Sequence, residues 1–214
     1  MKLPDDSQTH KKDPHYKQAK QKGYRARSAY KLLDIQKRFN IFKRAFYILD
    51  LGSAPGSWLQ ISKKIAEENL EKYNDQYYHR DHFKILGVDV KNISSIEGVS
   101  TVKMDFNTPE FQNEIDIFFQ NKKLDIILSD ASINKSGNKF SDQIRQTRLN
   151  YKILEIARKN LKYKGILVLK TFQGQDFNEL LKIMKNEYQY VKSYKPKASK
   201  KGSNEIYIIG LKKK

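Results

Sequence analysis

Four charged residues in this chain, two lysines and two acids, have the types that proton removal from a weakly acidic hydroxyl requires. They are Lys31 in YRARSAYKLLDI, Asp130 in DIILSDAS, Lys170 in ILVLKTFQG and Glu205 in KKGSNEIYIIG. A lysine that acts as a general base must be partly neutral, which a second cation nearby favours, and a lysine can otherwise stabilise a developing alkoxide. The two acids would orient the ammonium groups and balance their charge. Taken singly, each of these residues is as readily explained as a solvated surface group.

A glycine-rich turn follows the first apolar run of the chain. The segment ILDLGSAPGSWLQ at 48–60 reads as a buried strand, a turn and the start of a helix. Gly52 and Gly56 let the backbone turn tightly and approach a ligand closely. The spacing differs from the GxGxxG fingerprint of dinucleotide-binding folds, which argues against a dehydrogenase.

Acidic residues end the strand candidates that come next. Asp89 in GVDV could accept hydrogen bonds from both hydroxyls of a ribose, and Asp105 in KMDFN could accept one from an adenine amino group. One such acid alone is more often solvated or a cap. Three strand-end acids in order, with Asp130 the third, favour S-adenosylmethionine as the ligand. A Lys-Asp-Lys-Glu set beside that pocket favours methyl transfer to a ribose 2′-hydroxyl.

The pattern of apolar runs predicts an α/β fold. Strands are expected at 46–51, 84–90, 99–104, 124–129, 165–171, 188–194 and 205–211, and helices at 24–39, 57–69, 141–161 and 175–187. Because apolar strands alternate with helices, we expect a mostly parallel sheet covered on both faces, with ligands beyond the carboxyl ends of the strands. Residues 1–15 are predicted to be a flexible basic tail and 16–214 a single domain. Residues 70–83, which show no regular spacing of apolar residues, are predicted to be a surface insertion.

The charge of the chain favours a polyanionic partner. The 214 residues carry 42 Lys and Arg against 24 Asp and Glu, a formal net charge of +18. Basic residues gather at 11–31 and 192–201, which predicts nucleic acid as the partner. The RNA-binding candidates are Arg25, Arg27, Lys197, Lys200 and Lys201.

Several other classes of protein lose support. There is no cysteine, so disulfides and cysteine-based zinc sites are excluded. No apolar run approaches the ~20 residues of a membrane span, and the N-terminus lacks the apolar core of a secretory signal. The cluster from His79 to His82 offers two histidines and one aspartate, which is more often surface than a metal site. We expect no metal, no membrane partner and a monomer.

These motifs together resemble the FtsJ/RrmJ family of ribose 2′-O-methyltransferases over roughly residues 13–211. DPHYKQAKQKGYRARSAYKLLDI, ILDLGSAPGSWLQ, LSDASINKSG, LVLKTFQG and KPKASKKGSNEIYIIG occur in the family's order. The resemblance implies a Rossmann-like sheet of seven strands with the last antiparallel, and Lys31, Asp130, Lys170 and Glu205 as the catalytic set. It implies S-adenosylmethionine as donor and S-adenosylhomocysteine as product. The implied donor contacts are Gly52, Ser53, Pro55, Gly56, Trp58, Asp89, Asp105 and Asp130, although Trp58 could equally be a packing residue.

The resemblance also implies a substrate. Family members with similar TFQG and KASKKGSNE segments act on large-subunit ribosomal RNA, usually at a uridine, free or in a pre-ribosomal subunit. DPHYKQAK and KASKKGSNE are most similar to organellar members, which favours a mitochondrion or other organelle over the cytoplasm or nucleolus. The alternatives are a tRNA 2′-O-methyltransferase of the same fold and a non-catalytic RNA-binding ribosome-assembly factor. One departure is Ser132-Ile133-Asn134, where the family has an Ala-Pro pair, so a less rigid loop is expected.

Overall fold

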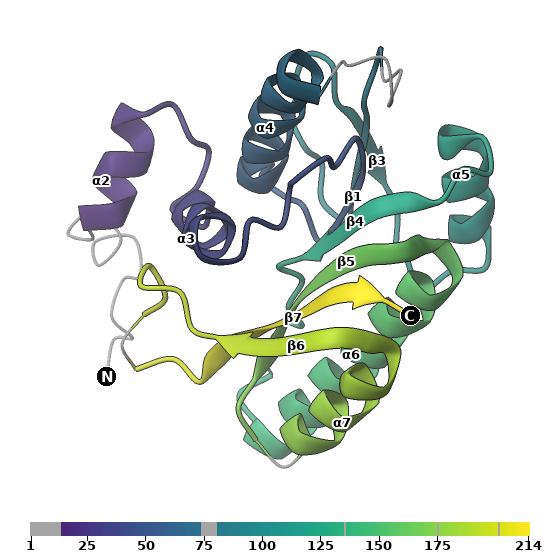
Figure 1. The fold of residues 1–214 in the computed structure, drawn as a ribbon. Coiled ribbons are helices and arrows are strands. Elements are labelled where there is room, and N and C mark those ends of the chain that lie inside the picture. The colour runs from purple at the N-terminus through teal and green to yellow at the C-terminus, as the bar shows by residue number, and fades with distance from the viewer. Residues whose placement is uncertain (1–13, 74–80, 135, 175, 201) are drawn as a thin grey trace.

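A single seven-stranded sheet organises the computed structural model, which describes residues 14–73, 81–134, 136–174, 176–200 and 202–214 (Figure 1). The strand order is β3-β2-β1-β4-β5-β7-β6. In chain order the strands are β1 (Tyr47–Leu51), β2 (Lys84–Asp89), β3 (Ser100–Lys103), β4 (Leu124–Ser129), β5 (Leu161–Phe172), β6 (Tyr188–Tyr194) and β7 (Glu205–Lys213). All seven predicted strands are therefore present.

Strand direction decides which residues can meet. β1 to β5 pair in parallel, whereas β7 lies between β5 and β6 and runs antiparallel to both. Glu205 consequently pairs with Phe172, so the first residue of β7 lies level with the last residue of β5. We call this side of the sheet, where the parallel strands end, its carboxyl edge, and the opposite side its amino edge. The predicted fold class, with an antiparallel last strand, is confirmed.

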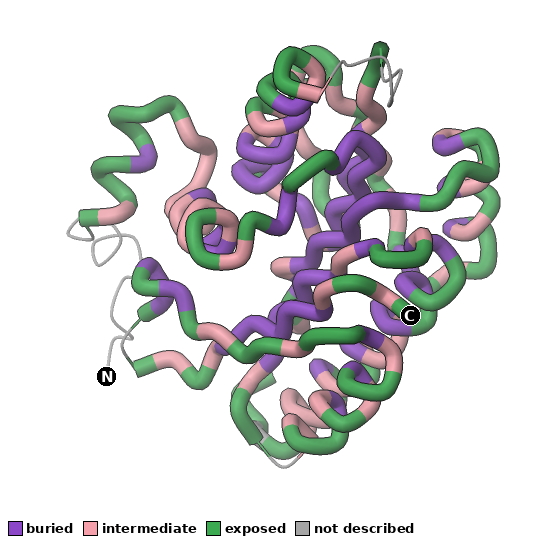
Figure 2. The backbone as a smooth tube through the Cα atoms, in the orientation of Figure 1, coloured by how far each residue is buried: buried purple, intermediate pink, exposed green. Residues whose placement is uncertain are grey.

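Helices cover both faces of the sheet. They are α2 (Pro14–Gln21), α3 (Ala29–Phe39), α4 (Ser57–Tyr73), α5 (Glu110–Phe119), α6 (Lys139–Asn160) and α7 (Phe177–Glu187). Leu128 and Val168 pack with residues of α3 and α4, while Ile127 and Leu167 pack with residues of α5, α6 and α7. The central strands are buried on both sides (Figure 2), which is why they read as continuous apolar runs.

Some predicted boundaries were wrong. The helix expected at 24–39 begins at Ala29, and residues 14 and 15, assigned to a flexible tail, begin α2. Residues 1–13 of that tail lie outside the described residues. The helix expected to end at 69 runs to Tyr73, because Asn69 is buried and donates to the carbonyls of Phe42 and Ala45. Residues 70–73 of the predicted insertion are therefore helical, and 74–80 lie outside the described residues.

No helix in the described segments is both long enough and apolar enough to span a bilayer.

Candidate active site

Lys31, Asp130, Lys170 and Glu205, the four charged residues singled out from the sequence, converge at the carboxyl edge of the sheet. Nζ of Lys31 lies 2.6 Å from Oε1 of Glu205 and 4.0 Å from Oδ1 of Asp130. Nζ of Lys170 lies 3.1 Å from the same Oδ1 and donates to the backbone carbonyl of Asp130 at 2.6 Å. They come from α3, the end of β4, β5 and the start of β7. Asp130 is the centre of the cluster because it contacts both ammonium groups.

The cluster is buried. Lys31 is 8% exposed and Lys170 is 7% exposed, so neither reaches out to solvent as a surface lysine would. Buried charges are stable only when paired and hydrogen-bonded, as they are in this cluster. Burial acts to raise the pKa of Asp130, but the ammonium groups of Lys170 and Lys31 outweigh it and hold that pKa below its usual value. Asp130 therefore remains a carboxylate between the two lysines.

Tyr207 belongs to the cluster, and the sequence analysis missed it. Its hydroxyl donates to Oδ1 of Asp130 at 2.6 Å, and Nζ of Lys31 lies 5.8 Å from the centre of its ring. Burial raises the pKa of Tyr207 well above its ordinary value, and Asp130 and Glu205 raise it further, so it stays a phenol that donates. The alternation of side chains along a strand could have identified Tyr207. Glu205 and Tyr207 are two residues apart on β7, so their side chains lie on the same face of the sheet.

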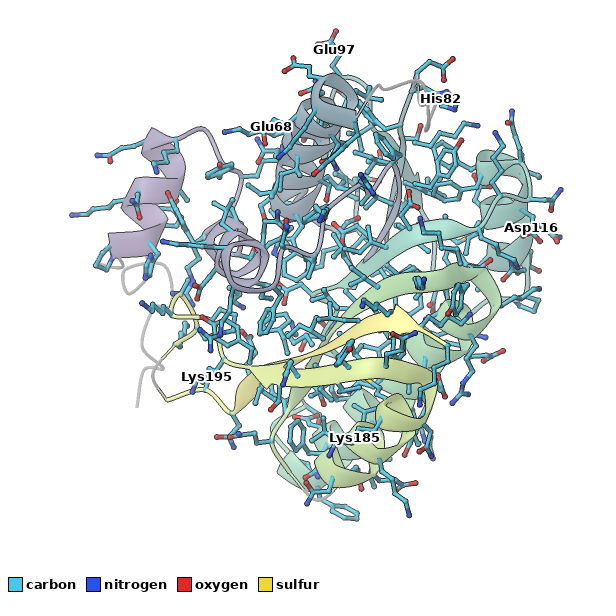
Figure 3. All side chains as sticks on the ribbon, in the orientation of Figure 1. Glu68, His82, Glu97, Asp116, Lys185 and Lys195 are labelled. Carbon is cyan, nitrogen blue, oxygen red and sulfur yellow. The ribbon has the colours of Figure 1, made fainter. Side chains whose placement is uncertain are left out.

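Polar contacts fix the segment that carries Glu205. The hydroxyl of Ser199 donates to Oε1 of Glu205 at 3.1 Å. Oδ2 of Asp34, one turn after Lys31 on α3, accepts from the Tyr194 hydroxyl at 2.9 Å and from the Lys197 backbone at 2.8 Å. The connection from β6 to β7, on which Figure 3 labels Lys195, is thereby tied to the helix that supplies Lys31.

A cavity of about 330 Å³ opens beside the cluster at the carboxyl edge. Its lining includes four of the predicted donor contacts, Gly52, Asp89, Asp105 and Asp130. Gly52 has φ +74°, and a Cβ there would come within 2.6 Å of Ala131, so only glycine fits this turn. The full lining is Gly52, Ala54, Asp89, Val90, Lys91, Asp105, Phe106, Asn107, Asp130, Ala131, Ser132, Ile133, Asn134 and Leu149.

The two acids of this cavity retain acceptor capacity. Oδ2 of Asp89 accepts from the Ala54 backbone and Oδ1 from the Lys91 backbone, both at 2.9 Å, which leaves each oxygen a further lone pair. Oδ1 of Asp105 accepts both its bonds from Asn107, and its Oδ2 accepts none from the described residues. Both carboxylates can therefore accept hydrogen bonds from a ligand.

The other four predicted donor contacts lie outside the cavity lining: Ser53, Pro55 and Gly56 belong to the turn after β1, and Trp58 belongs to α4. Trp58 is 2% exposed, donates to the carbonyl of Ser28 at 2.9 Å and stacks against Tyr207 with ring centres 5.8 Å apart. This placement favours its packing role. Direct donor contact by these four residues stays a prediction.

Arg25, predicted to bind RNA, instead contacts the turn at 52–56, which we call the glycine-rich turn. Its guanidinium donates to the carbonyls of Pro55 at 3.1 Å, Ser94 at 2.6 Å and Ser95 at 2.7 Å. A Cβ at Gly56 would meet the same guanidinium at 2.8 Å. Arg25 thus joins the glycine-rich turn to the β2–β3 connection, and no local sequence pattern indicates such a long-range contact.

The remaining predicted RNA-binding residues are distributed as follows. Arg27 is half-buried in the turn before α3, and Lys197 and Lys200 are exposed on the connection before β7. Lys201 lies outside the described residues. His79 of the histidine cluster does so too, while Asp81 and His82 hydrogen-bond to each other ahead of β2 (His82 is labelled in Figure 3).

The loop expected to be less rigid without a proline is held by a buried glutamine. Oε1 of Gln146, on α6, accepts from the Ile133 backbone at 3.1 Å, and its Nε2 donates to the carbonyl of Ala131 at 3.4 Å. Gln146 is fixed in turn by Asn150. The hydrogen bonds of Gln146 thus restrain the part of this loop that lines the cavity.

Asp50 is a further buried acid that the sequence analysis left without a role. Neither oxygen of its carboxyl has a hydrogen-bond partner among the described residues. Burial raises the pKa of Asp50 well above its ordinary value, and the charges of Asp130 and Asp89 raise it further. Asp50 is therefore neutral under conditions where Asp130 is ionised.

A sheet of this order, with acids at successive strand ends beside a cavity and buried lysines next to it, defines a Rossmann-like methyltransferase. Comparison with known proteins specifies the family. Residues 24–213 match the FtsJ-like methyltransferase family. The chain belongs to this family.

Named relatives are similar over nearly the whole chain. A protein of Methanosarcina acetivorans named ribosomal RNA large subunit methyltransferase E is 40% identical over 94% of this chain and 69% of its own length. A protein of the same name from Methanocorpusculum labreanum is 40% identical over 92% of this chain and 89% of its own. The crystal structure of a Plasmodium falciparum protein described as a ribosomal RNA methyltransferase superposes with a TM-score of 0.73 at 28% identity, covering 89% of this chain and 98% of that one.

Proposed function

We propose that this methyltransferase transfers a methyl group from S-adenosylmethionine to the ribose 2′-hydroxyl of a nucleotide, a uridine, in large-subunit ribosomal RNA. The observation that carries the proposal is the convergence of Lys31, Asp130, Lys170 and Glu205 beside the cavity. The names of the relatives support the substrate.

The cavity fits the proposed donor. The tight turn at Gly52 lets the backbone approach a ligand, and Asp89 and Asp105 keep lone pairs for ribose hydroxyls and an adenine amino group. S-adenosylmethionine supplies a methyl group on a sulfonium, a strong electrophile with a neutral leaving group. The chain would hold the ribose oxygen in line with that methyl group, and such positioning supplies much of the rate.

The lysines would handle the proton of the hydroxyl. We assign proton acceptance to Nζ of Lys170 as a neutral amine, after its ammonium form has released a proton to solvent, a loss that the nearby Lys31 cation favours. Asp130 positions this Nζ through both its carboxylate and its carbonyl. Nζ of Lys31, fixed by Glu205, would stabilise the oxygen as negative charge develops on it. Tyr207 would hold Asp130 in place by donating to it.

The RNA would reach this site across basic residues at its rim. Arg27, Lys197 and Lys200 neighbour the segments that carry Lys31 and Glu205, so RNA phosphates would be bound next to the chemistry. We propose a single domain over 16–214 that acts as a monomer. The enzyme would act inside the cell, where ribosomal RNA is, and in an organelle if the similarity of DPHYKQAK and KASKKGSNE to organellar members reflects its location.

Mapping of ribose methylation tests this function. Large-subunit RNA from cells that lack the protein should lose methylation at one ribose, and purified protein with S-adenosylmethionine should restore it. Restoration on tRNA instead of ribosomal RNA would support the tRNA alternative. If a Lys170→Ala protein restored methylation as well as the parent does, the result would support the non-catalytic assembly factor.

A further inference from the structure

A second basic cavity lies at the amino edge of the sheet, away from the proposed active site. It has a volume of about 240 Å³ and is formed by the α3–β1 connection and the start of β5, with Lys43, Arg44, Lys162 and Lys164 in its lining. Phe46 of this lining immediately precedes β1, whereas Gly52 of the donor cavity immediately follows it. At a rise of ~3.3 Å per residue, the two cavities are roughly 20 Å apart. We propose that this amino-edge surface is a second contact for the phosphate backbone of the RNA substrate, an inference that rests on the proposed function.

The charge at this cavity is only partly compensated. Asp125 is its one acidic lining residue, and Oδ2 of Asp125 accepts from the Phe46 and Tyr47 backbones at 2.7 and 2.8 Å. Oδ1 of Asp125 pairs with Lys162. Among the described residues, no carboxylate pairs with Lys43 or Lys164. An anion could therefore be bound there without displacing an existing ion pair.

The fold places further lysines on the same edge. Parallel strands begin at the amino edge, and the antiparallel β7 ends there, so residues before β4 and at the end of β7 lie on this edge as well. These are Lys122, Lys123, Lys212, Lys213 and Lys214. Such an extended row of cations suits a polyanion better than a single phosphate.

Three cations of this edge occupy left-handed backbone. Arg44 has φ +59°, Lys164 has φ +62° and Lys212 has φ +58°. The other non-glycine residues of the described segments with positive φ are two asparagines and one glutamine. Glycine and asparagine adopt this conformation readily, whereas residues with long side chains adopt it at a cost in conformational free energy. Residues in such strained conformations are typical of functional sites.

Two exposed tyrosines accompany these lysines. Tyr163 is 64% exposed and Tyr190 is 54% exposed. Nζ of Lys164 lies 5.1 Å from the ring centre of Tyr163, and Nζ of Lys212 lies 5.1 Å from that of Tyr190. Exposed rings among cations can stack on unpaired bases, which favours RNA over an acidic protein as the ligand. One long RNA could contact both edges, and each contact would raise the effective concentration at the other.

Neutralising the amino edge tests the proposal. The variant is Lys43→Gln with Lys164→Asn and Lys212→Asn, because asparagine accepts positive φ and the fold should be retained. The matched control removes the same charge elsewhere, through Lys63→Gln, Lys64→Gln and Lys182→Gln on α4 and α7. The measurement is the affinity of each protein for in vitro transcribed large-subunit ribosomal RNA over a series of KCl concentrations.

The amino-edge variant should bind this RNA more weakly, with a salt slope flattened by about 2 units for three lost phosphate contacts. The control should change by less than half as much, and both should keep the parent's S-adenosylmethionine affinity and thermal midpoint. A variant with the parent's slope, or a control with an equal loss, would overturn the proposal and leave an acidic protein as the ligand of this edge. Methyl transfer is scored separately with the parent protein, so failure of the proposed function would be distinguishable from failure of the second contact.

Discussion

Lys31 and Glu205 form a 2.6 Å ion pair although one lies near the start of the chain and the other near its end. The pair joins α3 to β7 across the carboxyl edge of the sheet. Because Ser199 and Asp34 reinforce the same junction, α3 and the segment that leads into β7 are bound to each other at the proposed catalytic cluster. The site therefore depends on the tertiary fold more than on any local motif.

Lys170→Ala should lower the rate of methyl transfer at least about 100-fold, since general acid–base groups contribute roughly that much or more. Lys170 contacts Asp130 but does not itself line the cavity proposed for the donor, so donor affinity should stay near that of the parent. Radiolabelled methyl transfer and calorimetry of donor binding give the two readouts. Lys31→Ala and Glu205→Ala should act in the same direction less completely. Transfer at the parent's rate by Lys170→Ala would remove that lysine from the mechanism.

Asp89→Ala should weaken binding of S-adenosylmethionine at least about tenfold, because hydrogen bonds to a charged acceptor contribute about 1.5–3 kcal/mol each and about 1.4 kcal/mol is a factor of ten. Glu68→Ala, which removes an exposed acid on α4 (Figure 3), is the control and should bind as the parent does. Calorimetry measures both. Equal affinities for the two variants would contradict the assignment of the donor cavity.

Arg25→Ala should weaken donor binding by roughly tenfold, because the turn at Pro55 loses its tie to Ser94 and Ser95. Arg38→Ala removes an exposed arginine that lies over the rings of Phe39 and Tyr194, and it should leave donor affinity unchanged. If Arg25→Ala instead weakened only RNA binding, its guanidinium would serve the RNA as the sequence first indicated.

Asp50→Asn should stabilise the fold increasingly as pH rises. The pKa of Asp50 is raised in the folded protein, so above about pH 4 the unfolded chain loses this proton while the folded one keeps it, and stability falls with pH. The neutral amide removes that penalty. Its advantage in unfolding free energy should grow by up to about 1.4 kcal/mol per pH unit until the folded-state pKa is reached.

Urea unfolding at pH 5 and pH 7 measures that advantage. Glu97→Gln, at an exposed site labelled in Figure 3, should show a nearly constant difference from the parent. A gap between Asp50→Asn and the parent that stays constant with pH would mean that Asp50 ionises in the folded protein.

Sequence patterns predicted the sheet well because its central strands are buried on both faces. Parallel strands end at one edge, so acids after successive strands were expected to meet, and Asp89, Asp105 and Asp130 do line one cavity. Glu205 reaches the same edge of the sheet because β7 is antiparallel, a direction that only the family resemblance implied.

The features that were missed depend on contacts between distant segments. Arg25 binds carbonyls at 55, 94 and 95, and backbone carbonyls carry no residue-type signal. The helix expected from residue 24 begins only at Ala29, and the backbone of Arg25 donates instead to Oε1 of Gln60 on α4. Helix α2 was overlooked because it buries little besides Ala19 and shows almost no apolar face.

The position of β7 inside the sheet has a consequence for biosynthesis. A chain that emerges from its N-terminus can pair β1, β4 and β5 early, but β6 has no neighbour in the sheet until β7 follows it. Until then the apolar edge of β5 remains open, and open edges of this kind are prone to intermolecular pairing. Glu205 and Tyr207 arrive with that same strand. A nascent chain therefore completes its sheet and the proposed catalytic cluster in one late step, and partly synthesised copies lack Glu205 and Tyr207 at that site.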